Sequence, residues 1–271
     1  MIRVFVLSAL VCVAAFTVRA EVPLTLTGNA VEGGLMFGKT NPDSYVAFEK
    51  KPVEVSANGD FLISFGRDSA GTRELTIFTP GDARVELIEV ADRDFKIERI
   101  DGLPKRKVTP DPKAIARIGK EKKEINAARQ ETDAVPYYLG GLQWPAMGRI
   151  SGVYGSQRIL NGKPRRPHYG TDIAAPTGTP IRAVAPGRVA FVHTGMFFNG
   201  KTVLIDHGLG LRSIYIHLSE TFVTAGQQVD LNTKIGAIGQ TGRATGPHLH
   251  FGMTHDTTPV DPEVVLGPMP N

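Results

Sequence analysis

The sequence Gly246-Pro247-His248-Leu249-His250-Phe251 carries the clearest structural signal in the chain. Side chains alternate between the two faces of a β-strand, so His248 and His250 would share one face while Leu249 and Phe251 anchor the other. Two imidazoles side by side on a rigid strand favour metal binding or proton transfer. A chance pair with a structural role is the alternative, and ligands from another segment would decide between the two.

The segment His168-Tyr169-Gly170-Thr171-Asp172 offers such ligands. All seven histidines of the chain lie between His168 and His255, and the first 167 residues contain none. We expect Gly170 to let the backbone turn so that His168 and Asp172 point at one ion. With one histidine of the 248–250 pair they make three ligands and an open fourth position, which is the pattern of a catalytic zinc site.

A third element is Tyr215-Ile216-His217-Leu218, which we expect to form a strand with Tyr215 and His217 on one face. Tyr215 is a candidate groove residue in contact with substrate, and a core position is its alternative. The chain has no His-Glu-x-x-His helix, so it is not a metalloprotease of that design.

The other histidines have weaker signals. His207 follows a predicted strand, and it either orients a metal ligand from behind or holds a turn. His193 and His255 are expected on the surface or in loops.

These elements together resemble the LytM/lysostaphin-type zinc metallopeptidases, a family of peptidoglycan endopeptidases. The resemblance covers roughly residues 148–262 and four motifs in the family's order. These are His168-x-x-x-Asp172, Gly200-Lys-Thr-Val-Leu-Ile-Asp-His-Gly208, Tyr215-x-His217-Leu218 and Gly246-Pro-His-Leu-His250.

The resemblance implies one Zn²⁺ per chain, held by His168, Asp172 and His250. It implies that His217 and His248 are the unligated catalytic pair beside the metal. The implied substrate is the peptide stems of peptidoglycan, and an envelope regulatory protein is an expected further partner. Arg165 and Arg166 lie in a segment, residues 151–167, that has four basic and no acidic residues. They are candidates for attracting substrate carboxylates.

The fold expected is all-β in two parts. Short alternating runs separated by turns predict an immunoglobulin-like β-sandwich within residues 21–108. The expected strands are 24–27, 45–48, 53–56, 61–65, 75–78, 85–88 and 95–100, with a tight hairpin at Asn58-Gly59. Residues 146–271 are expected to form an antiparallel β metallopeptidase domain.

The linker between these parts, residues 109–145, contains one predicted helix. Asp111 can cap it and Pro112 can begin it. Ile115, Ile118 and Ile125 recur at helical spacing and form a narrow apolar stripe.

The first twenty residues have the pattern of a secretory signal peptide, with Arg3, an apolar core and a small residue at Ala20. An uncleaved anchor is the alternative. Cleavage after Ala20 would remove Cys12 and leave a mature chain without cysteine or membrane span. Without Arg3 and Arg19, 29 basic residues stand against 27 acidic residues, and a net charge of +2 does not suggest a nucleic-acid partner.

The function expected is an exported zinc endopeptidase of the periplasm, cell envelope or extracellular space. The first alternative is a non-catalytic cell-wall binding protein or activator of other murein hydrolases that uses the same groove. A secreted adhesion protein acting through the N-terminal sandwich is a third interpretation, with only generic strands to support it.

Overall fold

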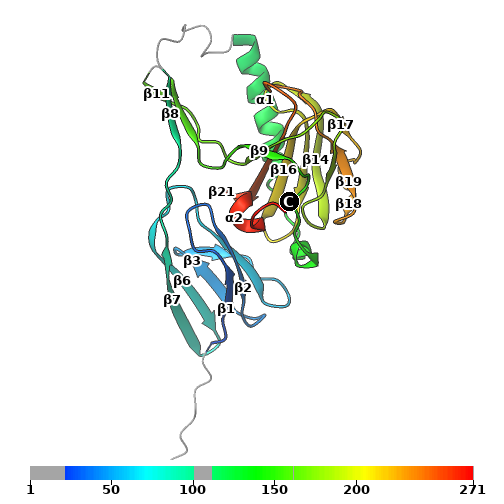
Figure 1. The fold of residues 1–271 in the computed structure, drawn as a ribbon. Coiled ribbons are helices and arrows are strands. Elements are labelled where there is room, and N and C mark those ends of the chain that lie inside the picture. The colour runs from blue at the N-terminus through cyan, green and yellow to red at the C-terminus, as the bar shows by residue number, and fades with distance from the viewer. Residues whose placement is uncertain (1–21, 101–111, 161, 271) are drawn as a thin grey trace, which may run out of the picture.

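The computed structural model describes residues 22–100, 112–160 and 162–270, and it shows an all-β protein with two α-helices in that part of the chain (Figure 1). The predicted signal segment lies outside the described residues. In the part of the chain that the structure describes, no helix combines the length and the apolarity needed to cross a membrane.

The N-terminal part is a β-sandwich of seven strands, as predicted. The sheets pair in the orders β1-β2-β5 and β4-β3-β6-β7. In constant-type immunoglobulin domains the fourth strand pairs with the fifth, whereas here β4 pairs with β3. The pairing of the other strands is the same. The core between the sheets is apolar, with Phe61 and Leu75 fully buried. The strands are β1 (Thr25–Gly28), β2 (Leu35–Lys39), β3 (Tyr45–Phe48), β4 (Lys51–Val53), β5 (Asp60–Ser64), β6 (Gly71–Thr79) and β7 (Asp82–Val90).

Three sequence expectations for the sandwich were wrong. The strand expected at 53–56 shares only Val53 with β4. Strand β2 was not predicted, because the run Leu35-Met36-Phe37 lacks polar alternation and follows two glycines. The turn at Asn58-Gly59 exists, with φ of +88° at Gly59, but it does not make a hairpin. It carries the chain from one sheet to the other, because β4 pairs with β3 whereas β5 pairs with β2.

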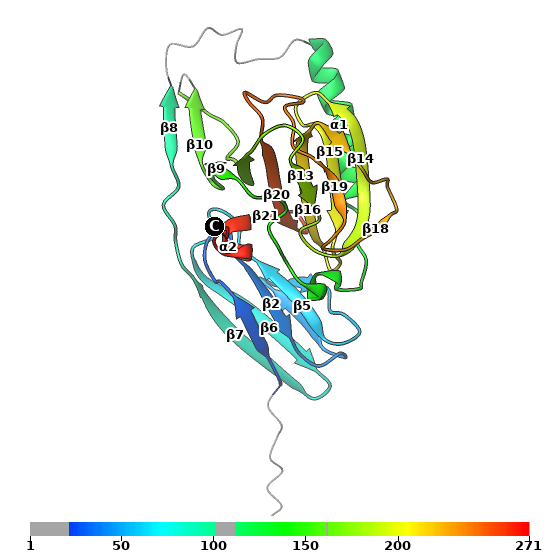
Figure 2. The same ribbon diagram turned by 45° about the vertical axis from the view of Figure 1, so that its right-hand side comes forward.

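The predicted strand at 95–100 also lies outside the sandwich. It forms β8 (Ile97–Ile100), which pairs in parallel with β10 (Gln157–Leu160), and β10 pairs with β11 (Lys163–Pro164). This small sheet stands beside the C-terminal part of the chain (Figure 2). The N-terminal segment therefore supports the loop that precedes His168.

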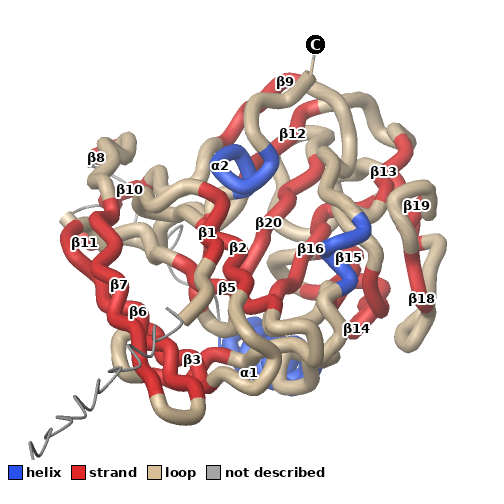
Figure 3. Tube along the Cα trace, turned by 90° about the horizontal axis from the view of Figure 1, so that it is seen from below, coloured by secondary structure: helices blue, strands red, loops and turns tan. Residues whose placement is uncertain are grey.

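The C-terminal part is built on one large antiparallel sheet, as predicted, with strand order β18-β14-β15-β16-β20-β12-β9 (Figure 3). A smaller sheet, β13-β19-β17, packs against one face, and the main core lies between the two sheets. The large sheet contains β9 (Arg149–Gly152), β12 (Thr171–Ala174), β14 (Gly187–Met196), β15 (Gly200–Asp206), β16 (Leu211–Leu218), β18 (Gln228–Val229), β20 (Leu249–His255) and, beside β20, β21 (Thr258–Val260). The smaller sheet contains β13 (Pro180–Arg182), β17 (Glu220–Thr221) and β19 (Lys234–Ala237).

The predicted helix is α1 (Pro112–Ala128). Ile125 is buried against Leu204 and Ile214 of the large sheet, whereas Ile115 is 52% exposed, so the apolar stripe is as narrow as expected. The buried Glu121 accepts hydrogen bonds from Arg117 Nε and from the backbone N–H of Phe197. These contacts hold α1 to the turn between β14 and β15.

Two short helical segments were not predicted: the 3-10 turn at Tyr137–Gly140 and the helix α2 (Pro262–Leu266). The signal for α2 was present. Asp261 accepts a hydrogen bond from the Glu263 N–H as an N-cap, and Pro262 occupies the first helical position.

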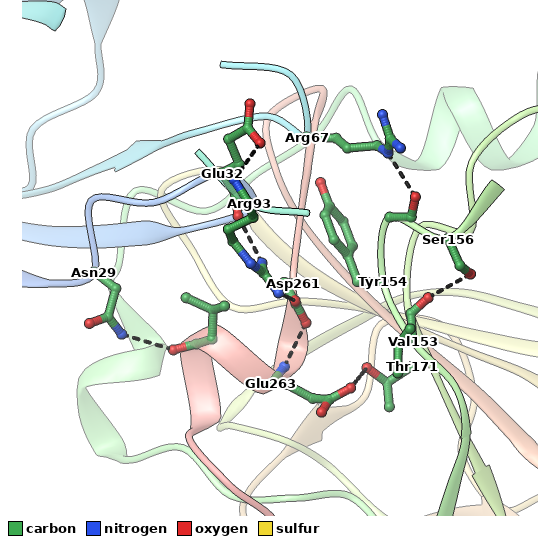
Figure 4. A network of polar contacts seen from close by, with 12 residues as sticks. Asn29, Glu32, Arg67, Arg93, Val153, Tyr154, Ser156, Thr171, Asp261 and Glu263 are labelled. Atoms are coloured by element: carbon green, nitrogen blue, oxygen red, sulfur yellow. Dashed lines mark hydrogen bonds and ion pairs between the residues drawn. The ribbon is translucent and has the colours of Figure 1, made fainter. Parts of the chain in front are cut away.

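The sandwich and the C-terminal part are joined by a polar network around this cap (Figure 4). Arg93 of the sandwich donates to the Asp261 carboxylate over 2.8 Å and to the Glu32 carbonyl over 2.8 Å. The Asp261 side chain is only 3% exposed. The backbone N–H of Asp261 donates to the Gly33 carbonyl, and Arg67 Nε donates to the Gly155 carbonyl.

We predict that Arg93→Met lowers the free energy of unfolding by about 2 kcal/mol, because it leaves the buried Asp261 carboxylate without its cation. The value is smaller than the roughly 3–5 kcal/mol expected for a fully buried pair, because Arg93 itself is 31% exposed. Urea unfolding of both proteins measures it. The control is Lys120→Met, whose exposed pair with Glu124 should contribute at most about 0.5 kcal/mol. Equal losses in the two variants would contradict the assignment.

Candidate active site

Strand β20 lies between β12 and β16, and the register of its pairing with them determines which side chains lie together in the site. His250 is directly opposite Asp172 on one side and Ile216 on the other. Residues paired in this way point to the same face of a sheet. The next residues of β20, Leu249 and Phe251, are fully buried on the opposite face, as the sequence predicted. We call the face that carries Asp172, Ile216 and His250 the site face.

His168, Asp172 and His250 converge on the site face. His168 Nε2 lies 2.8 Å from His250 Nδ1, and Asp172 Oδ1 lies 3.1 Å from His168 Nε2 and 2.8 Å from His250 Nδ1. The three residues form a group whose ligand atoms all lie within 4.8 Å of one another. The structure therefore brings together the three residues predicted as metal ligands.

Two glycines leave the space that this convergence requires. A Cβ at Gly170 would lie 2.5 Å from the Phe251 carbonyl and 2.9 Å from the His250 ring. Gly170 is therefore needed for close approach, and its φ does not lie in the left-handed region. A Cβ at Gly152 would lie 2.4 Å from Asp172 Oδ2. Gly152 is a site residue that the sequence analysis missed, because no motif marks it.

The donor set fits a zinc ion. His168 Nδ1 lies 3.0 Å from the Val153 carbonyl, which can only accept, so Nδ1 carries the proton and Nε2 presents a lone pair. Tetrahedral ligands of zinc lie about 3.3 Å apart when each is about 2.0–2.1 Å from the metal. The three observed separations, 2.8–3.1 Å, are within a few tenths of an ångström of that value.

The charge states favour cation binding. Burial alone would raise the pKa of Asp172, but hydrogen bonds with His168 and His250 outweigh it and hold the pKa far below its usual value. Burial lowers the pKa of His250, with only partial opposition from its hydrogen bond to Asp172. At neutral pH the group is therefore an ionised carboxylate with a neutral His250.

His217 reaches the same region through an irregularity in β16. Tyr215 pairs with Val203 and Leu218 pairs with Lys201, so β16 has one residue more than β15 between these pairs. His217 has φ of +66°, in the left-handed region. This is a β-bulge, which interrupts the alternation of side chains. The expectation that Tyr215 and His217 share a face was therefore wrong.

His217 and His248 lie together beside the three predicted ligands. Their ring centroids are 4.8 Å apart, and the His217 ring is 6.5 Å from that of His250. His217 Nδ1 lies 2.8 Å from the Thr241 carbonyl, and His248 Nδ1 lies 2.8 Å from the Gly246 carbonyl. Each carbonyl requires a proton on Nδ1, so both rings have Nε2 available as a proton acceptor. Burial lowers the pKa of His217 to about 4, so this ring is neutral at pH 7.

Tyr215 and His207 are both core residues, and neither has the role in the site that the sequence suggested as a candidate. Tyr215 is fully buried, packs on Phe251 and accepts hydrogen bonds from the Val184 N–H and from Ser213 Oγ. It is a core residue and does not line a groove. His207 is also fully buried, and its nitrogens face the Pro186 carbonyl and Ser213 Oγ. With both nitrogens engaged, His207 orients no metal ligand and is structural.

The remaining histidines, His193 and His255, differ in burial and in their neighbours. His193 is half-buried in β14, with its Nε2 4.0 Å from Glu124 of α1. His255 is only 7% exposed, so the expectation of a surface residue was wrong. Its Nδ1 lies 2.9 Å from Ser64 Oγ of the sandwich, and contact with the other part of the chain buries it.

The loop that precedes His248 contributes a basic residue that the sequence analysis missed. The Arg243 guanidinium lies 4.2 Å from the Phe198 ring centroid, and the Arg243 N–H donates to the Phe198 carbonyl. The Arg166 guanidinium, in the segment before His168, lies 5.0 Å from the Tyr169 ring centroid. Burial and then the charge of Arg165 lower the pKa of Arg243.

Comparison with known proteins agrees with this geometry. Residues 166–262 match the model of peptidase family M23. The crystal structure of a peptidase M23 from Pseudomonas aeruginosa superposes with a TM-score of 0.68 and is 30% identical. The match covers 88% of this chain and 96% of that chain.

Two curated relatives match over shorter regions. The DD-carboxypeptidase/endopeptidase Mpg of Neisseria meningitidis is 43% identical over 122 residues, which is 45% of this chain and 28% of the relative. The cell division protein DipM of Caulobacter vibrioides is 34% identical over 165 residues, which is 59% of this chain and 26% of the relative. The chain thus spans about a quarter of the length of these relatives.

The buried His207 should make stability depend on pH. Burial lowers its pKa to about 4 in the folded protein, against about 6.5 when the chain is unfolded. The unfolded state therefore binds a proton between these values while the folded state does not, so stability is lost as pH falls from 6.5 towards 4. The contribution is about 2 kcal/mol at pH 5. Urea unfolding at pH 7.5 and pH 5 should show a smaller pH-dependent loss in His207→Gln by about this amount. Identical losses in the two proteins would refute the assignment.

Proposed function

The chain belongs to peptidase family M23, and we propose that it is a zinc-dependent endopeptidase that hydrolyses peptide cross-links of bacterial peptidoglycan. The observation that carries this proposal is the convergence of His168, Asp172 and His250 beside two further histidines with free Nε2 atoms. The similarity to the Neisseria protein, a DD-carboxypeptidase/endopeptidase, supports peptide hydrolysis as the reaction class.

In the proposed mechanism, His168, Asp172 and His250 would hold one zinc ion per chain. Zinc supplies Lewis acidity, which makes a water more acidic and polarises the carbonyl of the scissile bond. His217 and His248 supply the proton transfers. A neutral Nε2 accepts a proton from the attacking water and later donates it to the leaving amine. The other ring, when protonated, stabilises the negative charge that develops on the carbonyl oxygen.

The neutral state of His217 at pH 7 suits it to the role of base, since burial lowers its pKa to about 4. The fixed orientation of both rings supports the proposal independently of which ring takes which role. Hydrogen bonds to the Thr241 and Gly246 carbonyls hold each ring so that no reorientation precedes proton transfer.

We further propose that the protein is exported and works in the periplasm or cell envelope, where peptidoglycan lies. The proposed division is a signal peptide at 1–20, a sandwich domain at 21–108, a linker at 109–145 and the peptidase domain at 146–271. In this scheme the sandwich is a spacer or binding domain, fixed to the peptidase domain by the Arg93–Asp261 ion pair. An envelope regulatory protein is a proposed partner.

A second candidate function is a non-catalytic activator of murein hydrolases that uses the same site. The similarity to DipM favours keeping it, because that protein is named for cell division and not for hydrolysis. The intact set of three ligands and two proton-transfer histidines favours the enzyme. Digestion of purified peptidoglycan by the zinc-loaded protein separates the two functions: released peptide fragments support the enzyme, and their absence supports the activator.

We predict different results for the two histidines of the 248–250 pair. His250→Ala removes one of three protein ligands, so zinc content and cleavage rate should fall together. His248→Ala leaves the three ligands in place, so zinc should remain bound while cleavage slows by about 100- to 10,000-fold. Metal analysis and cleavage rates of both purified variants provide the measurement.

The opposite pattern, zinc lost from His248→Ala and kept by His250→Ala, would reverse the two assignments. If both variants keep metal and activity, the catalytic site lies elsewhere. His193→Ala is a matched control, because His193 is half-buried beside Glu124 and should affect neither zinc content nor cleavage.

We also propose that Arg165 and Arg166 attract the carboxylates of peptidoglycan stems. The double variant Arg165→Glu/Arg166→Glu should lower kcat/KM, and the loss should be largest at low salt, where screening is weakest. Cleavage rates between about 20 and 300 mM salt test this, since the Debye length shortens several-fold over that range. A loss that is the same at every salt concentration would point to local damage instead.

A further inference from the structure

The helix α1 holds the turn between β14 and β15, residues 195–199, which we call the β14–β15 turn. The carboxylate of Glu121 accepts the backbone N–H of Phe197 over 2.8 Å. Arg117 Nε donates to the same carboxylate over 2.7 Å, and Arg117 Nη2 donates to the Gly195 carbonyl over 2.6 Å. Two side chains that are one helical turn apart thus fix two backbone groups of this turn.

The apolar contacts of α1 place it on the site face of the large sheet. Ile125 belongs to an apolar cluster with Met196 of the turn, and Ile214 of β16 packs against that cluster. Ile214 lies two residues before Ile216, so strand alternation puts both side chains on the face that carries His250. Figure 1 shows α1 alongside the strands of this sheet. The helix therefore lies on the same face as the site and not behind the sheet.

The β14–β15 turn also holds the backbone of His217. The His217 N–H donates to the Asn199 carbonyl over 2.8 Å. His217 is the bulged residue of β16, with φ of +66°. Such a conformation persists in a non-glycine residue only where the surrounding contacts impose it. The hydrogen bond to Asn199 is one of these contacts.

The same turn fixes the loop that orients the His217 ring. The Phe198 carbonyl accepts the Arg243 N–H over 2.9 Å, and the Lys201 N–H, just after the turn, donates to Thr241 Oγ1 over 2.9 Å. Thr241 in turn provides the carbonyl that lies 2.8 Å from His217 Nδ1. Both the backbone and the ring of His217 therefore depend on where the turn lies.

The burial of Glu121 indicates that position matters here, and not only coverage of the sheet. Glu121 is 7% exposed although it carries a carboxylate. Burial of a charge is costly unless hydrogen bonds and a cation compensate for it. An apolar side chain at this place would cover the sheet without that cost. The two hydrogen bonds of the carboxylate instead fix the direction in which the turn is held.

We infer that α1 is part of the catalytic apparatus, and that Glu121 is a positioning residue for the proton-transfer ring of His217. Glu121 acts through the β14–β15 turn and contributes no metal ligand. The helix ends at Ala128, whereas the match to the family model begins at residue 166. The functional unit of this chain therefore extends beyond the matched residues. This inference rests on the proposed function, in which His217 transfers protons.

Kinetics of Glu121→Ala in the zinc-loaded full chain test the inference. Zinc content should stay at the wild-type level, because the three predicted ligands are untouched. With a soluble cross-linked peptide dimer from peptidoglycan as substrate, kcat should fall by about 10- to 100-fold, the size of effect expected when a catalytic group is misplaced by about 1 Å. KM should change little, because no residue that contacts substrate is altered.

Hydrogen–deuterium exchange measured by NMR provides a readout that does not depend on cleavage. In Glu121→Ala the His217 N–H should exchange at least about tenfold faster, because its acceptor at Asn199 is no longer held in place. The reference is the Val189 N–H of β14, which donates to the Gln227 carbonyl at the other end of that strand. Its exchange should be unchanged. A general loss of stability would accelerate both amides equally.

Three further variants complete the test. Glu121→Gln should restore most of kcat and of the slow His217 exchange, because its amide oxygen still accepts the Phe197 N–H. Arg117→Met should change both in the same direction as Glu121→Ala but less, and its exposed position leaves folding intact. The control Glu124→Ala removes an equal charge from the same helix, where Glu124 pairs only with Lys120 and His193, and should change neither.

The inference is overturned by a wild-type kcat in fully zinc-loaded Glu121→Ala, or by zinc that is lost together with activity. Equal acceleration of the His217 and Val189 amides would also overturn it, as would a failure of Glu121→Gln to restore either quantity. A wild-type chain that releases no fragments refutes the proposed function instead. In that case the exchange rates alone decide whether α1 holds His217.

Discussion

The pairing of β20 with both of its neighbours is the constraint on which the site depends. Backbone hydrogen bonds to β12 and β16 place Asp172, His250 and Ile216 in one row, and the buried Leu249 and Phe251 prevent the strand from slipping. A shift of one residue would turn His250 into the core and expose Phe251. The apolar core on one face thus fixes the position of polar ligands on the other.

Backbone carbonyls determine which ring nitrogen carries the proton in three histidines of the site. Val153, Thr241 and Gly246 each accept the Nδ1 proton of one ring, so that Nε2 of that ring is directed into the site. A carbonyl can only accept, which makes this choice of tautomer independent of side-chain neighbours. Because of the bulge in β16, His217 lies on the site face, whereas regular alternation would place it on the opposite face. A non-glycine residue in the left-handed region costs of order 1 kcal/mol, and here this conformation brings the His217 ring beside His248.

The N-terminal sandwich also supports the site, through contacts with α2. The Arg93–Asp261 ion pair holds the cap of α2, and Glu263 of α2 lies 3.5 Å from Thr171, the neighbour of Asp172 (Figure 4). Strand β8 extends the small sheet that precedes His168. Two of the predicted ligands are therefore supported by contacts from the part of the chain before α1, one through the sandwich and one through β8, which gives that part a structural role.

The sequence by itself determined the all-β class, the helix at Pro112, and the residues that converge on the site, because these follow from local alternation, capping and motif spacing. Motif spacing predicted the group His168, Asp172 and His250, and it also predicted the pair His217 and His248. Only the tertiary structure decided how they meet. The bulge at His217 depends on pairing with β15, the close approach at Gly152 depends on Asp172 from another strand, and the burial of Tyr215, His207 and His255 depends on what packs over them. The segment after α1 returns to the large sheet, where Thr132 Oγ1 and the Asp133 N–H donate hydrogen bonds to the Asp206 carboxylate, and no local pattern encodes that contact.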